Sequence, residues 1–170
     1  MPPSEVDLTR LTYRGPDGVT LVRSRGRPFI TIKEFNDWLG SYPLNLTSQE
    51  PAVARRQALE QMVAFKLIVA KARETGYEQK VRSPEGVLDD RSLAMSYVRD
   101  QLANQTAVTD RQADAYYAAN PARFGRVVPD DAPPELKRMA VKVSMQGERL
   151  WERVKSWMEQ ASLTYSEDAG

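Results

Sequence analysis

The feature that most constrains the fold is the stretch PAVARRQALEQMVAFKLIVAKARETG, which runs from residue 51 to residue 76. Between residues 62 and 72 only two lysines interrupt the apolar side chains. A helix that is apolar on nearly all sides must be covered by other elements. Gly76 follows two basic residues, the order that is typical of a helix C-terminus. The stretch therefore predicts a central core helix in a mainly α protein.

Length and charge exclude several classes of protein. The chain has 170 residues, enough to bury a core, with 24 basic and 23 acidic side chains and a net charge of +1. This near-balance argues against a dedicated nucleic-acid binder, which carries a clear basic excess. No apolar run reaches the roughly 18 residues that a membrane span needs. The opening MPPSEVDLTR lacks the pattern of a signal peptide. We expect either a cytosolic protein or one from which a signal peptide or lipid anchor was removed, and proximity to a membrane only in the second case.

The chain contains neither cysteine nor histidine. This composition excludes a thiol nucleophile, a disulfide, a Cys/His zinc site and every catalytic pair that needs histidine. Neither a GxGxxG nor a GxxxxGK[ST] phosphate loop occurs. The acidic pairs at residues 89–90 and 130–131 stand beside prolines or helix-start signals, which favours turns and helix caps over acid–base chemistry. We therefore expect no enzyme, no catalytic residues, no metal and no cofactor.

Local signals predict most of the remaining elements. Thr31 and Glu34, and likewise Thr109 and Gln112, have the spacing of a capping box at a helix start. Gly26 supplies the positive φ of a hairpin turn. The expected strands are 11–14, 19–24, 29–32 and 163–165, and the expected helices besides the central one start near residues 31, 89, 109 and 135.

The last predicted helix, residues 135–161, carries a heptad-like seam about 40 Å long. The seam consists of Leu136, Ala140, Val143, Gly147, Leu150, Val154, Trp157 and Ala161, and Met139, Trp151 and Met158 are expected to widen it on one flank. Such a seam is compatible with a coiled-coil dimer. Packing within the chain is favoured, because the central helix needs a cover.

Four segments resemble a known family. They are RGRPFITIKEF (25–35), RRQALEQMVAFKLIVAKARETG (55–76), VTDRQADAYYAANPARF (108–124) and ERLWERVKSWMEQASLTY (148–165). They are similar to the patterns V-N-G-x-x-I-T-x-x-E-F, L-x-x-L-I-x-x-x-L-L-x-x-x-A-x-x-x-G, V-T-D-x-E-x-x-A-Y-Y-x-x-N-P-x-x-F and L-x-x-x-A-x-I-x-Y of the SurA/PrsA/PpiC class of peptidyl-prolyl isomerase chaperones. The third match is the most specific. The resemblance implies a SurA N-domain-like helical module with a small N-terminal β-hairpin and a long C-terminal helix that packs back on the central helix.

One departure from the family pattern affects function. In catalytic members a parvulin-type isomerase domain follows the Asn-Pro-x-x-Phe segment, whereas here a proline-rich stretch of residues 125–134 takes its place. Parvulin sites also use histidine, which this chain lacks. The resemblance thus implies an N-terminal extension (1–18), a helical domain (19–124), a linker (125–134) and a C-terminal helix and tail that complete the same domain (135–170).

By resemblance, the expected function is ATP-independent binding of unfolded or extended client polypeptide in the periplasm or cell envelope, without isomerase activity. The expected polypeptide-binding residues are Met139, Met145, Trp151 and Met158, because methionine and aromatic side chains form adaptable apolar surface. The alternative is a structural or assembly subunit that scaffolds a specific protein partner, with a homodimer formed by exchange of the C-terminal helix.

Overall fold

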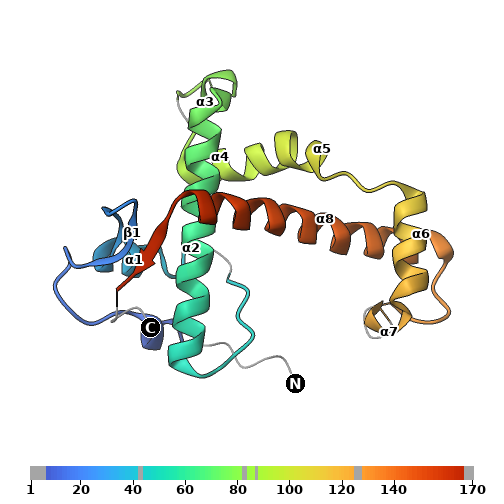
Figure 1. Cartoon of the computed structure of the whole chain (residues 1–170), viewed down its shortest axis with the longest axis horizontal. Coiled ribbons are helices and arrows are strands. Elements are labelled where there is room, and N and C mark those ends of the chain that lie inside the picture. Colours follow the sequence, from blue (N-terminus) through green and yellow to red (C-terminus); the bar gives the residue numbers. More distant parts are fainter. Residues whose placement is uncertain (1–6, 42–43, 82–83, 87, 125–127, 167–170) are drawn as a thin grey trace. The chain divides into compact units, whose positions relative to one another are not determined.

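The computed structural model describes residues 7–41, 44–81, 84–86, 88–124 and 128–166, and it is mainly α with one small antiparallel sheet, as predicted (Figure 1). The elements are η1 (Leu8–Leu11), β1 (Thr20–Ser24), β2 (Arg27–Thr31), α1 (Ile32–Trp38), α2 (Pro51–Glu74), α3 (Tyr77–Lys80), α4 (Asp90–Tyr97), the π-helical η2 (Val98–Leu102), α5 (Ala103–Gln105), α6 (Asp110–Ala119), α7 (Pro121–Phe124), α8 (Pro134–Gln160) and β3 (Leu163–Tyr165).

The chain forms two compact units. Unit 1 consists of Met1–Lys71 together with Ser156–Gly170, and unit 2 consists of Ala72–Lys155. Helices α2 and α8 therefore each contribute to both units. Residues 125–127 of the expected linker lie outside the described residues.

The sheet of unit 1 has the strand order β2-β1-β3. Arg25 and Gly26 both have positive φ, 51° and 77°, which makes the tight turn of the predicted hairpin. Pro28 lies in β2 at the edge of the sheet, where its missing N–H does no harm. Strand β3 pairs with β1, so segments more than 130 residues apart in sequence share one sheet.

The strand expected at residues 11–14 is wrong, because Leu11 ends the 3-10 helix η1 and residues 12–14 pair with no strand of the described structure. The side chain of Asn36 in α1 accepts from the Tyr13 N–H at 3.0 Å and donates to the Tyr13 carbonyl at 3.1 Å. The backbone of Tyr13 thus obtains from a side chain the partners that a neighbouring strand would have supplied.

The core of unit 1 lies between α1, α2 and the sheet. Phe35, Leu59 and Val63 are fully buried in it. The end of α8 packs against the same cluster through Trp157 and Met158. The Lys71 ammonium of α2 lies 5.8 Å from the centre of the Trp157 ring. The C-terminal end of α8 therefore packs back on the central helix, as expected.

Unit 2 contains the predicted helix starts near residues 89 and 109. Asp89 caps α4 by accepting from the Ser92 N–H at 2.7 Å. Thr109 caps α6 by accepting from the Gln112 N–H at 3.2 Å, and the Gln112 side chain accepts from the Thr109 N–H at 3.0 Å. Both caps satisfy N–H groups that the first turn leaves without helical partners.

Thr109→Ala is expected to lower the free energy of unfolding by about 1 kcal/mol, because the capping oxygen of α6 is lost. Urea unfolding followed by circular dichroism measures this change. Thr109→Ser keeps the hydroxyl and should lose much less. Equal losses for Ala and Ser would show that the hydroxyl does not stabilise the helix.

A buried tyrosine joins α3 to the π-helical segment η2. The Tyr77 hydroxyl donates to Asp100, and the ring of Tyr77 lies 5.4 Å from that of Tyr97. Hydrogen bonds from Arg99 and Tyr77 lower the pKa of Asp100 to about 2, and burial raises the pKa of Tyr77 to about 12. The native state thus favours the charged carboxylate beside the neutral phenol.

The pair predicts a dependence of stability on pH. The contribution of Asp100 is present above the unfolded pKa near 4 and is lost as the pH falls toward about 2. The contribution of Tyr77 is present below the unfolded pKa near 10 and is lost as the pH rises toward about 12. Urea unfolding across pH should show a smaller acid loss for Asp100→Asn than for the wild type. Identical acid profiles would contradict the native hydrogen bonds of Asp100.

Candidate polypeptide-binding surface

One side of α8 is attached to α6 and α7 by ion pairs around a small apolar cluster. Ala113, Phe124 and Val141 form the buried cluster. Arg138 of α8 pairs with Asp114 at 2.9 Å, and Lys142 pairs with Asp110. These cationic partners lower the pKa of both aspartates. The charged side of α8 therefore faces α6, and its orientation there is set by specific pairs.

A third ion pair connects α7 to α8. The Arg123 guanidinium pairs with Glu148, and the Tyr116 hydroxyl lies 3.2 Å from a carboxylate oxygen of the same glutamate. The rings of Tyr116 and Tyr117 hold Phe124 with centroid distances of 5.8 and 6.0 Å. Phe124 is thus docked between α6 and α8 as an anchor.

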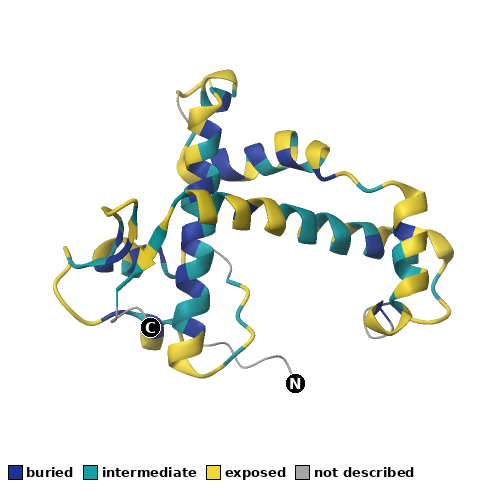
Figure 2. Ribbon diagram, viewed as in Figure 1, coloured by how far each residue is buried: buried dark blue, intermediate teal, exposed yellow. Residues whose placement is uncertain are grey.

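The opposite side of the same half of α8 carries exposed apolar side chains. Figure 2 shows exposed, half-buried and buried residues along this helix. Leu136, Met139 and Val143 are 53%, 61% and 66% exposed. We call these three residues, together with half-buried Ala140, the apolar stripe. The prediction of a buried seam is therefore wrong for this half of the helix, and Gly147 of the seam is exposed as well. The reason is that α6 binds the charged side, on which Val141 lies, and leaves the heptad side without a cover in the described chain.

A groove of about 510 Å³ runs beside the apolar stripe. It is lined by Arg123, Phe124, Leu136, Met139, Ala140, Val143 and Ser144. Only two of the seven lining side chains, Arg123 and Ser144, are polar. A groove of this kind buries apolar side chains of a ligand and offers few groups for chemistry.

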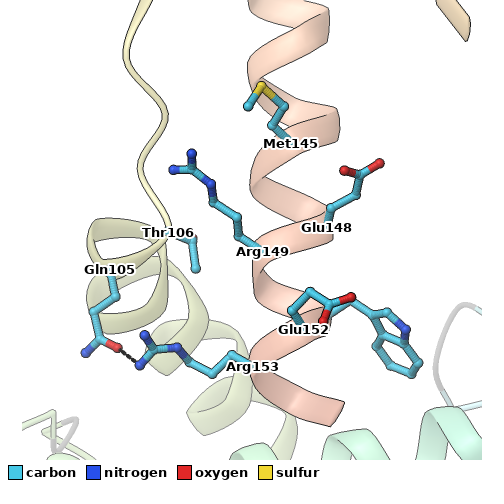
Figure 3. Close-up of a pocket in the computed structure, with 8 residues that line it drawn as sticks. Gln105, Thr106, Met145, Glu148, Arg149, Glu152 and Arg153 are labelled. Atoms are coloured by element: carbon cyan, nitrogen blue, oxygen red, sulfur yellow. Dashed lines mark hydrogen bonds between the residues drawn. The ribbon is translucent and has the colours of Figure 1, made fainter. Parts of the chain in front are cut away.

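A second hollow of about 570 Å³ lies where α5 and the following segment meet α8 (Figure 3). It is lined by Gln105, Thr106, Met145, Glu148, Arg149, Trp151, Glu152 and Arg153. Arg149 donates to the Ala107 carbonyl at 2.6 Å, and Arg153 donates to the Gln105 side chain. In Figure 3 both arginines extend toward α5 and the segment after it. These contacts attach the connecting segment to α8, and the lining mixes charged, polar and apolar side chains.

The four expected binding residues do not lie together. Met139 is exposed in the groove, whereas Met145 and Trp151 line the second hollow. Met145 also packs against the cluster around Phe124. Met158 belongs to unit 1, where it packs against the core.

Sequence reasoning missed Leu136 and Val143 as exposed residues because it assigned them to a buried seam. A usable signal was present. Asp110 and Asp114 are four residues apart, as are Arg138 and Lys142, so each pair lies on one face of its helix. Two such pairs of opposite charge indicate that α6 packs on the charged side of α8.

The described residues show no group of acidic side chains that could hold a metal ion. None of the helices described is long and apolar enough to cross a membrane. What the arrangement offers is an apolar surface, and binding through burial is the chemistry that it supports.

A scan against models of protein families gives no match, and searches of curated proteins and of solved structures give none either. The resemblance to the SurA/PrsA/PpiC class therefore rests on the four sequence segments alone.

Proposed function

We propose that this protein binds apolar segments of unfolded polypeptides without ATP and without prolyl isomerase activity, as a chaperone module of the cell envelope. The observation that carries the proposal is the apolar stripe, where three large apolar side chains stay exposed on a helix that is otherwise held by ion pairs. Contiguous exposed apolar surface marks interaction sites in soluble proteins.

The physical character of the stripe suits many partners. Burial of apolar surface is non-directional, so it does not demand one ligand geometry. Met139 adds an unbranched, adaptable side chain, which allows the surface to adjust to different side chains of a client. Burial elsewhere on α8 is uneven, since Val141 and Val154 are buried whereas Trp151 is 39% exposed.

The assignment to the cell envelope and the absence of isomerase activity follow from the family resemblance. The chain has no histidine, and the proline-rich stretch 125–134 stands where catalytic relatives carry the isomerase domain. The alternative function, an assembly subunit, uses the same surface for one dedicated partner.

Suppression of aggregation separates the two functions. Two unrelated proteins are diluted from denaturant, and light scattering is followed at increasing ratios of this protein to client, without ATP. We expect scattering to fall for both clients in proportion to the amount added. Absence of suppression for both clients would contradict the chaperone function and favour the dedicated subunit.

A further inference from the structure

We infer that the apolar stripe takes an amphipathic helix whose flanking positions are acidic. The inference rests on the proposed function, since it specifies which client segments the surface selects. Three observations support it: the element that already covers the end of the same seam, the backbone of α8, and the charges beside the stripe.

The seam of α8 continues without interruption from the apolar stripe into unit 1. At its C-terminal end, Trp157 and Ala161 pack against a core that contains Leu59 and Val63 of helix α2. Where the seam is covered, in unit 1, it packs against a core to which the helix α2 contributes. The part whose seam residues are exposed or half-buried, from Leu136 to Leu150, is about 20 Å long and offers the same spacing to a further helix.

A helical occupant also solves the problem of backbone hydrogen bonds. Backbone groups inside α8 pair within the helix, so an extended segment lying on it finds no row of donors and acceptors. Strand addition needs an exposed sheet edge, which the stripe does not provide. A helix brings its own backbone pairing and presents apolar side chains at the required spacing.

Small residues on the seam favour close approach of that helix. Ala140 and Gly147 occupy equivalent heptad positions, one heptad apart. A Cβ placed on Gly147 would meet nothing within 4 Å in the described structure. A glycine inside a helix is unfavourable relative to alanine, and packing within unit 2 does not require it. A partner helix whose large side chains enter the holes at these positions gives the glycine a role.

The charges beside the seam specify the partner. The seam residues occupy the a and d positions of the heptad, and the e and g positions flank them. Between residues 136 and 154 these flanking residues are Lys137, Met139, Ser144, Gln146, Trp151 and Arg153. Lys137 and Arg153 are the charged residues of this set, and both are basic. Lys137 donates to the Asp130 carbonyl at 2.8 Å and Arg153 donates to the Gln105 side chain, so in the described structure both cations donate to neutral oxygens.

Flanking charges select partner and orientation in paired helices. A partner with glutamates at its own flanking positions would compensate Lys137 and Arg153. A second copy of this chain would bring no acidic residue to these positions in either orientation. The charge pattern therefore favours an acidic amphipathic segment of another polypeptide over self-association.

Three labelled peptides of about 18 residues, long enough to cover the stripe as helices, test the inference. The first has leucine at the seam positions and glutamate at the flanks, the second has lysine at the flanks, and the third is a scramble of the first. Fluorescence anisotropy gives the affinities, and circular dichroism reports helix formation on binding. We expect the acidic peptide to bind about tenfold more tightly than the basic one at low salt, with a gain in helix. Equal binding of the first two peptides, or of the first and its scramble, would overturn the inference.

Charge reversal provides the decisive variant. K137E/R153E should invert the preference between the acidic and the basic peptide. The control K80E/R111E changes the net charge by the same amount at exposed positions on α3 and α6. It should leave the preference unchanged. If K137E/R153E fails to fold, K137Q/R153Q should remove the preference. An unchanged preference in K137E/R153E or K137Q/R153Q, once shown to be folded, contradicts the role of the two basic residues.

If an unfolded client binds to the wild type but the acidic and basic peptides bind equally, only this inference falls. If neither client nor any peptide binds, the proposed function falls with it.

Discussion

Leu59→Ala is expected to lower the free energy of unfolding of unit 1 by about 3–5 kcal/mol, because the change leaves a cavity in a close-packed core. Leu59 is 0% exposed and belongs to the cluster that α1, α2, the sheet and the end of α8 share. A typical domain is stable by only about 5–15 kcal/mol, so the loss is a large fraction of the total. Urea unfolding followed by tryptophan fluorescence measures it, since Trp38 and Trp157 both lie in unit 1.

Leu136→Ala is the matched control for this substitution. It removes the same atoms from a residue of the apolar stripe, which is more than half exposed. The expected loss is below about 1 kcal/mol, as for most surface substitutions. Similar losses at Leu59 and Leu136 would mean either that α2 is not the core helix or that the stripe is covered in solution.

Met139→Ser/Val143→Ser is expected to weaken binding of unfolded polypeptide by about 30- to 100-fold. Full burial of a methionine or valine side chain is worth about 1.5–3 kcal/mol, and the two changes together remove at least about 2 kcal/mol of that gain. Both side chains are exposed in the unbound protein, so the melting temperature should change little. Anisotropy of a labelled, permanently unfolded client gives the affinity, and a thermal melt verifies the fold.

Met95→Ser is the control for the binding measurement. Met95 lies on α4 in unit 2 and is 63% exposed, close to the value for Met139, but it is not part of the stripe. Its replacement should leave client binding within about twofold of the wild type. Equal weakening by both variants would show that binding follows general surface hydrophobicity and not the stripe.

Much of the fold is readable from the sequence because its determinants are local. The capping boxes at Thr31 and Thr109 need only residues within one helical turn. The hairpin needs the positive φ that Gly26 adopts readily. The central helix is recognisable because its apolar side chains surround the axis, and Leu59 and Val63 are buried as that pattern requires.

The π-helical segment η2 had no such signal. Residues 98–102 continue the periodicity of α4, and nothing local to VRDQL marks a wider turn. In the structure Asp100 lies within η2 and accepts from Tyr77, more than twenty residues earlier in the chain. A partner so distant in sequence affects local geometry only after the chain has folded.

The binding surface shows the same division most clearly. The helical period is enough to predict that α8 is a long helix with one apolar and one charged side. Which of the two sides is covered depends on packing between segments that are distant in sequence. Arg138 and Lys142 meet Asp114 and Asp110 across α6, so the charged side is packed and Val143 faces solvent. Hydrophobic periodicity identifies a face that gains from burial, but contacts between distant segments decide whether that face is covered, and among the described residues nothing covers the apolar stripe.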